Sequence, residues 1–236
     1  MKKIRKNIMQ VLFVFALGIG MFGLSAAAFA AGAKGPNAGQ DSFAYVKIYQ
    51  NKTNIVLYGS KNYLSATGSK AGKIKGAVYS KKTNTLTLNN FNHPTYNIEV
   101  NEMGSDFKLV IKGKKNSVQS IRVWGYYYGG SLAISGKGTL KVNANKKSPD
   151  GHGIHLNAEY TPSVLTIAKD TTVKAWRSKT SDGKKGYPFF VEGTTKSSKG
   201  ITSKGKLSGK VKKTYHPESK KLYNYCINAN TVTSKK

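Results

Sequence analysis

Acidic residues are scarce in this 236-residue chain, which has 10 Asp and Glu against 39 Lys and Arg and a formal net charge of +29. An excess of lysine on this scale indicates attraction to polyanions such as acidic polysaccharide, teichoic acid, nucleic acid or an anionic membrane surface. A solvated lysine coat that only keeps the protein soluble is the alternative. Catalysis by paired carboxylates across one cleft gains no support, because sequence spacing forces no two of the acids onto such a site.

Cysteine is nearly absent too, since Cys226 is the only one. A single thiol excludes an internal disulfide and any metal site built from two or four cysteines. We expect Cys226 to be a small buried apolar residue rather than a reactive one. Beyond the N-terminal segment, long apolar runs are also missing, and none approaches the ~20 residues that a membrane-spanning helix needs.

Residues 1–31 have the layout of a secretory signal peptide. A cationic start, 2–6, precedes an apolar stretch, 8–24, and Ala28-Phe29-Ala30 fits the A-x-A cleavage pattern. A retained membrane anchor is the alternative; the small residues after the apolar stretch and the lack of a basic stop-transfer cluster disfavour it. We therefore expect a secreted protein that is extracellular or associated with a cell wall.

After the signal, a flexible leader, 32–40, precedes one domain, 41–236. The domain consists of short apolar strands separated by Asn, Gly, Ser and Lys, with no convincing helical periodicity. Its last part, 177–236, is basic, with 15 Lys and Arg against 3 acids. Strands within 186–193 and 222–227 and a long basic turn over 194–213 are expected there.

An apolar-x-apolar triplet recurs along the domain. Its copies start at Leu86, Leu109, Leu132 and Leu165, in steps of 23, 23 and 33 residues. Each copy directs two side chains inward and one outward, and three copies are followed by a polar turn and a second β-type run. This order predicts an all-β, single-domain parallel β-helix, in which stacked coils bury a shared apolar column. The alternative is an antiparallel β-sandwich, because strand alternation suits both.

Two segments add a family resemblance. GAVYSKKTNTLTLNNF (76–91) and SLAISGKGTLKVNA (131–144), the latter followed by GHGI (151–154), resemble segments of the clostridial extracellular carbohydrate-binding β-helix family of Gram-positive bacteria. The likeness covers about residues 76–176. It implies a right-handed parallel β-helix similar in fold to pectate lyases, binding to plant cell-wall polysaccharide including acidic sugars, and calcium in some members. The chain departs from the family in having few acidic residues for a calcium site.

The aromatic run around three consecutive tyrosines is the most distinctive candidate site. Neighbouring residues of an extended chain alternate in direction, so Tyr126, Tyr127 and Tyr128 cannot all face one core. Exposed aromatic rings stack on sugar rings while their polar tips bind hydroxyl groups. Arg122 precedes Trp124 by two residues, so the two are expected to share a face, and Arg122 suits a carboxylate or phosphate partner. A hydrophobic patch covering a coil end is the alternative.

Asp150, His152, His155 and Glu159 form the densest group of metal-ligand types. Calcium would require several oxygen ligands from such a loop, and the two histidines suit zinc or another transition metal better. The spacing matches no known metal motif, and a polar surface loop is the alternative.

Taken together, these features predict a non-catalytic protein that binds an anionic, plant-type or cell-wall polysaccharide through lysines and exposed tyrosines. Nucleic acid is expected to bind only non-specifically, because no nucleic-acid motif is present. Two alternatives stay open: a polysaccharide lyase on the same fold, and a structural matrix or toxin-like interaction protein.

Overall fold

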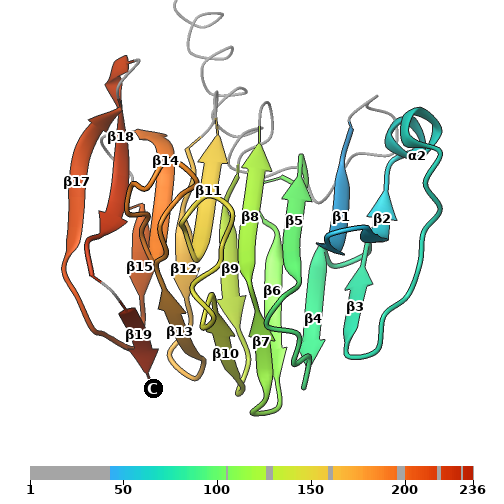
Figure 1. Ribbon diagram of the computed structural model, residues 1–236, viewed down its shortest axis with the longest axis horizontal. Coiled ribbons are helices and arrows are strands. Elements are labelled where there is room, and N and C mark those ends of the chain that lie inside the picture. Colours follow the sequence, from blue (N-terminus) through green and yellow to red (C-terminus); the bar gives the residue numbers. More distant parts are fainter. Residues whose placement is uncertain are drawn as a thin grey trace, which may run out of the picture. The chain divides into compact units, whose positions relative to one another are not determined.

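A computed structural model describes residues 43–104, 106–125, 130–158, 162–195, 200–216, 219–229 and 231–235 (Figure 1). The expected signal peptide and leader, 1–40, lie outside the described residues, as do Tyr126, Tyr127, Tyr128 and Glu159. The described chain is all-β, as predicted, apart from one short helix. None of its helices is long and apolar enough to cross a membrane.

The strands form three mixed sheets. In spatial order, the eight-stranded sheet consists of β17 (Val211–His216), β18 (Ser219–Ile227), β14 (Phe189–Thr195), β11 (Ile154–Ala158), β8 (Ser120–Gly125), β5 (Asn97–Asn101), β1 (Tyr45–Gln50) and β2 (Thr53–Gly59). The six-stranded sheet consists of β15 (Ile201–Ser203), β12 (Leu165–Ile167), β9 (Leu132–Ser135), β6 (Lys108–Lys112), β4 (Thr85–Asn89) and β3 (Ala77–Ser80). The five-stranded sheet consists of β16 (Lys206–Leu207), β19 (Thr231–Lys235), β13 (Thr172–Trp176), β10 (Thr139–Val142) and β7 (Asn116–Val118).

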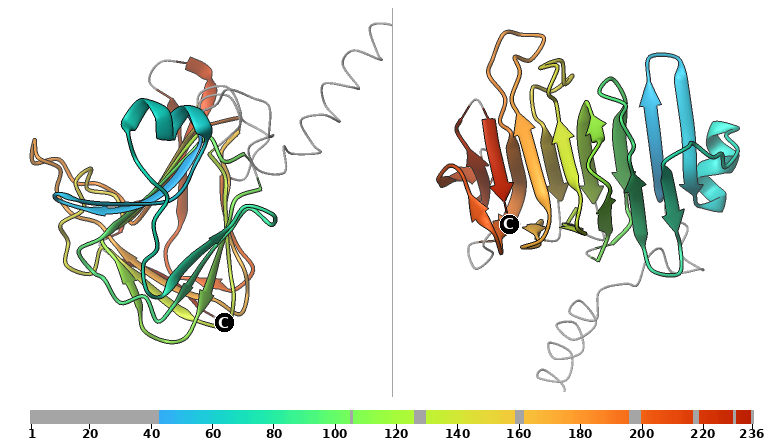
Figure 2. Two further views of the ribbon diagram at one scale, coloured as in Figure 1. Left: turned by 90° about the vertical axis from the view of Figure 1, so that its right-hand side faces the viewer. Right: turned by 90° about the horizontal axis from the view of Figure 1, so that it is seen from below.

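From β6 to β16 the chain visits the six-, five- and eight-stranded sheets in turn. Strands contributed by successive passes pair in parallel within each sheet, as β8 does with β5 and β11. Antiparallel strands pair at the ends of the parallel ladders: the hairpin of β1 and β2 at one end, and β17, β18 and β19 at the other. Figure 2 (left) shows the three sheets on different sides of a common interior.

One apolar core joins the three sheets, because alternate side chains of every parallel strand face it. Both apolar positions of all four triplets are buried, from Leu86 and Leu88 in β4 to Leu165 and Ile167 in β12. Each such side chain contributes roughly 1.5–3 kcal/mol relative to leaving it exposed. The recurring triplet is therefore the part of the sequence that builds the core.

The register of one step differs from the triplet alignment. Leu86 pairs with Leu109, and Leu132 pairs with Leu165, as the alignment predicts. Leu109, however, pairs with Ile134 rather than with Leu132. The turn after β9 passes so closely over β6 that a Cβ on Gly136 would lie 2.2 Å from the carbonyl oxygen of Ile111. A two-residue shift keeps the same side chains facing the core, because the side-chain period of a strand is two.

The helix α2 (Lys61–Thr67) was not expected from the sequence. Ser60 caps it, with its Oγ accepting a hydrogen bond from the Tyr63 backbone N–H at 3.2 Å, and Gly68 ends it in the left-handed region at φ 63°. Seven residues with one buried side chain, Tyr63, are too short to display helical periodicity.

The prediction of a long basic turn over residues 194–213 was wrong, because this range contains β15, β16 and the start of β17. Ile201 continues the ladder of the six-stranded sheet by pairing with Leu165, and its side chain is buried. Lysines such as Lys212 and Lys213 are exposed within a strand, so lysine content alone did not distinguish strand from turn.

Candidate functional site

Two rows of outward-facing side chains run across the eight-stranded sheet, perpendicular to its strands. Strand pairing aligns the first row as Lys47, Glu99, Arg122, His155 and Phe190. The same pairing aligns the second row as Tyr45, Asn101, Trp124, Asn157 and Glu192. Buried residues of the core alternate with both rows along every strand, so the rows are two residues apart and lie side by side on one face.

A pocket of about 510 Å³ opens between the two rows. It is lined by Tyr45, Glu99, Asn101, Arg122, Trp124, Gly125 and Asn157. Arg122 and Trp124, which the sequence predicted to share a face, both line it. The aromatic rings, amides and charged groups converge here from four different strands, β1, β5, β8 and β11.

A chain of hydrogen-bonded charges crosses the first row beside the pocket. Asp150, in the loop before β11, accepts a hydrogen bond from Nε of Arg122 at 3.0 Å. The same Asp150 oxygen lies 3.0 Å from Nδ1 of His155, whose Nε2 lies 3.1 Å from Glu192. Glu192 also accepts from the side-chain amide of Asn157 at 3.2 Å. Two pocket residues, Arg122 and Asn157, are thereby held at opposite ends of one network.

The network favours a charged imidazole at its centre. Ionised carboxylates only accept hydrogen bonds, so His155 donates to both of its neighbours only when both ring nitrogens carry protons. Burial lowers the pKa of His155, but the hydrogen bonds to Asp150 and Glu192 outweigh it and raise the pKa above its usual value. Burial likewise opposes ionisation of Asp150, yet His155 and Arg122 hold the pKa of that carboxyl well below its usual range.

Glu99 is the acidic member of the pocket and is also paired. Lys47 lies 2.8 Å from it, and the Tyr45 hydroxyl donates a hydrogen bond to it. Burial, together with this hydrogen bond to Glu99, raises the pKa of Tyr45, so its hydroxyl stays protonated. The cations Lys47, Arg122 and His155 therefore match the anions Glu99, Asp150 and Glu192, and this face is locally balanced in a strongly basic protein.

Aromatic rings extend the first row beyond the network. The His152 ring stacks on Phe190, with centroids 4.6 Å apart, and on Tyr187, 5.6 Å apart. Its Nδ1 accepts the Tyr187 backbone N–H at 3.0 Å. Burial, then the positive charge of His155, lowers the pKa of His152 to about 4. His152 is therefore neutral at physiological pH and acts as one more aromatic surface.

The structure brings together three of the four metal-ligand candidates, while Glu159 lies outside the described residues. Asp150 and His155 turn their polar atoms toward each other, and His152 uses Nδ1 for a backbone hydrogen bond. No group of three or more His, Cys, Asp or Glu side chains among the described residues is arranged to hold a metal ion. These residues form a hydrogen-bonded network in the place where the sequence suggested ligands.

Sequence reasoning missed Tyr45, Glu99, Asn101, Asn157 and Glu192 as parts of the site. They are separated from Arg122 and Trp124 by one or more passes of the chain, and only strand register brings them together. One signal was available: each is a polar or aromatic residue at an outward position of an alternating strand.

No protein-family model, no curated protein and no solved structure matches the chain. The resemblance to the clostridial family stays an expectation, and function has to be inferred from the chemistry of the site itself.

Proposed function

We propose that this is a secreted, non-catalytic protein that binds acidic, plant-type or cell-wall polysaccharide, and that its three sheets are the faces of a right-handed parallel β-helix. The cyclic visits to the three sheets and the parallel pairing of successive passes support this architecture. A solenoid of this kind presents long, regular surfaces along which an extended polymer can lie.

The pocket between the two rows is the observation that carries the proposal. Trp124 offers an aromatic ring to the apolar C–H surface of a sugar ring. Tyr45, whose ring contacts Tyr63 and the Lys47 ammonium group, forms part of the pocket wall. Asn101 and Asn157 supply amide donors and acceptors for hydroxyl groups, and Arg122 supplies donors for a carboxylate. Gly125 also lines the pocket. The three tyrosines predicted to bind sugar begin at the next residue of the sequence, Tyr126.

Binding without catalysis agrees with how the charged groups are used. Glu99, Asp150 and Glu192 each pair with a cation or an imidazole in the described network. Asp150 is unsuited to act as a general acid or base, which needs a pKa near the working pH, because the pKa of its carboxyl is held far below that range. These side chains position the pocket residues, and the lysine-rich remainder of the surface supplies long-range attraction to an anionic polymer.

The proposal is tested by applying residues 32–236 to a glycan array at two salt concentrations, followed by titration of the best ligand. Trp124→Ala is expected to weaken binding roughly tenfold, because the sugar loses one aromatic ring on which to stack. Tyr215→Ala is the matched control, because Tyr215 lies on β17 of the same sheet, is 67% exposed and does not line the pocket. Failure to bind any glycan, or equal affinities of both variants, would remove the pocket from the function.

A further inference from the structure

A second surface of this protein carries lysines in a regular pattern. The chain crosses from the six-stranded to the five-stranded sheet four times, between β6 and β7, β9 and β10, β12 and β13, and β15 and β16. Each crossing holds an exposed lysine, which we call the lysine ladder: Lys114, Lys137, Lys169 and Lys204. Asp170 is the only acid within these four turns.

Backbone hydrogen bonds stack the four turns on one another. Thr139, the first residue of β10, donates its N–H to the Gly113 carbonyl of the first turn at 3.1 Å, and Thr172, the first residue of β13, donates to the Gly138 carbonyl of the second turn at 3.1 Å. The Lys204 N–H reaches the Ile167 carbonyl at 2.9 Å and so joins the last two turns. Adjacent strands lie about 4.8 Å apart, so the turns repeat at about that spacing. The lysines are staggered along the turns, because the strand registers place Lys137 level with Asp170 and Lys169 level with Gly136.

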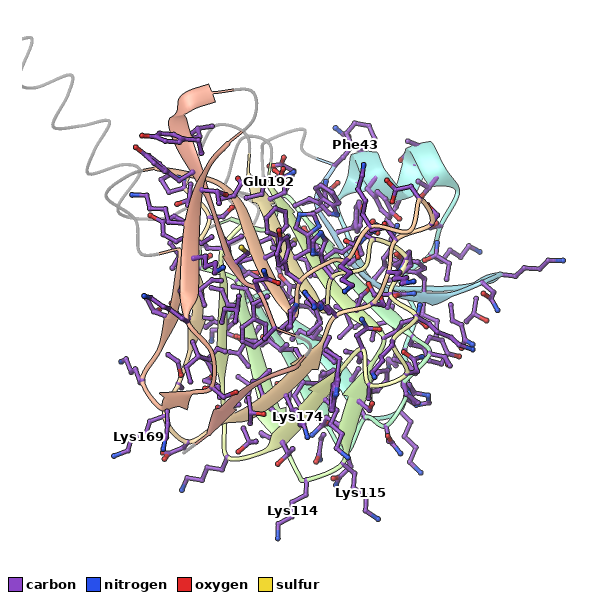
Figure 3. The ribbon with its side chains drawn as sticks, turned by 60° about the vertical axis from the view of Figure 1, so that its left-hand side comes forward. Phe43, Lys114, Lys115, Lys169, Lys174 and Glu192 are labelled. Atoms are coloured by element: carbon purple, nitrogen blue, oxygen red, sulfur yellow. The ribbon has the colours of Figure 1, made fainter. Side chains whose placement is uncertain are left out.

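More lysines flank the ladder. Lys115 is exposed beside Lys114 in the first turn, and Lys112 is exposed at the end of β6. On the five-stranded sheet, Lys141 and Lys174 occupy directly paired positions of β10 and β13. Figure 3 shows Lys114, Lys115 and Lys169 extending outward from the lower turns, away from Glu192. Like charges in directly opposed positions repel each other. Lys141 is exposed, and Lys174 is half-buried with its ammonium group over the Trp176 ring.

We infer that the lysine ladder is a binding site for a linear polyanion with carboxylates or phosphates repeated along its chain. Exposed lysines on four successive stacked turns match anions that recur along an extended chain. Lysine ammonium groups bind such anions without demanding one geometry. The ladder turns hold no aromatic residue, whereas single-stranded nucleic acids are held by stacking on aromatic rings. This site is separate from the pocket, whose charges are balanced by pairing.

The test compares two variants of residues 32–236 with equal loss of charge. The ladder variant carries Lys114→Ser, Lys137→Ser, Lys169→Ser and Lys204→Ser. The control variant carries Lys52→Ser, Lys70→Ser, Lys73→Ser and Lys82→Ser, four exposed lysines elsewhere on the chain. Polygalacturonate, inorganic polyphosphate and duplex DNA are titrated at several salt concentrations.

The ladder variant is expected to bind polygalacturonate, polyphosphate or both roughly tenfold more weakly, with a shallower dependence of affinity on salt. The control variant is expected to lose at most about twofold. A loss of affinity for polygalacturonate alone identifies the bound anion as carboxylate, and a loss for polyphosphate alone identifies it as phosphate. Equal weakening of both variants would reduce the ladder to part of a diffuse basic coat, and a ladder-specific loss confined to duplex DNA would also overturn the inference.

Two further measurements separate an effect on the ladder from an effect on the pocket or on folding. Trp124→Ala is expected to leave the binding of polyphosphate unchanged, because polyphosphate has no sugar ring for the pocket, so failure of the pocket and failure of the ladder are distinguished. Thermal unfolding at low salt is expected to show the ladder variant at least as stable as the control, because repulsion between stacked lysines is removed.

Discussion

Nδ1 of His155 lies 3.0 Å from the Asp150 oxygen that also receives the Arg122 guanidinium. The protonation state of His155 is therefore linked, through Asp150, to the orientation of the pocket residue Arg122. On its other side it meets Glu192, so one imidazole joins two carboxylates that come from different passes of the chain.

We expect the unfolding free energy to be greatest near pH 6.5 and to fall on both sides. The pKa of His152 is lowered to about 4, so as the pH drops from 6.5 the unfolded chain takes up that proton first. This costs up to about 3 kcal/mol by pH 4. The pKa of His155 is raised, so its contribution is complete below pH 6.5 and is lost as the pH rises through its folded value. Urea unfolding between pH 4.5 and 8.5 measures both limbs.

Two variants test which histidine causes the fall in unfolding free energy on each side of pH 6.5. His152→Asn keeps an acceptor near the Tyr187 N–H but does not titrate, so it should flatten the acid limb. His155→Asn keeps a donor toward Asp150 and should flatten the alkaline limb. An alkaline limb that survives His155→Asn would show that the network does not hold a charged imidazole.

Arg122→Lys is expected to weaken saccharide binding and to lower stability by about 1 kcal/mol, although the charge is conserved. Lysine cannot reproduce the planar guanidinium that contacts Asp150 while lining the pocket. Arg177→Lys is the control, because Arg177 bonds Asn228 in an exposed position. Calorimetric titration and urea unfolding report the two effects, and equal behaviour of both variants would contradict a positioning role for Arg122.

The sequence predicted the core better than the site. The triplets at Leu86, Leu109, Leu132 and Leu165 identified strands because a buried strand must alternate, and alternation is visible locally. The pairing of Leu109 with Ile134 was not visible, since it depends on how closely the Gly136 turn approaches β6. Cross-strand register is a property of two segments together.

The site illustrates the same limit. Arg122 and Trp124 were found because they are neighbours on one strand. Glu192 was not, because its side-chain contact with His155, 37 positions away, forms only once β11 pairs with β14. The net charge of the chain likewise did not predict the local charge at the site. The chain as a whole is strongly basic, yet cations and anions are paired around the pocket.

Asn116→Ala is expected to destabilise the protein by about 2–4 kcal/mol. The Asn116 side chain is buried and accepts the Phe91 N–H at 2.9 Å. Its amide group donates to the carbonyls of Lys112, Gly113 and Thr139, so it joins the first turn of the ladder to the strand of the next pass. Asn92→Ala at an exposed position should change stability by less than about 0.5 kcal/mol. Urea unfolding compares them, and similar losses would refute the special role of Asn116.

Gly136→Ala should be among the most damaging single-methyl changes in this protein. Gly136 has φ 109°, and an added Cβ would lie 2.2 Å from the Ile111 carbonyl oxygen and 2.9 Å from the Ile111 nitrogen. Backbone atoms of a paired strand cannot move aside, so we expect a loss of about 3 kcal/mol or more. Gly183→Ala is the matched control: Gly183 also has a positive φ, 80°, but a Cβ there meets nothing within 4 Å. Gly183→Ala should lower the unfolding free energy by about 1 kcal/mol, because only the backbone conformation is strained. Thermal unfolding of both variants separates steric contact from backbone strain, and equal losses would mean that the turn after β9 does not pack against β6 as closely as the structure has it.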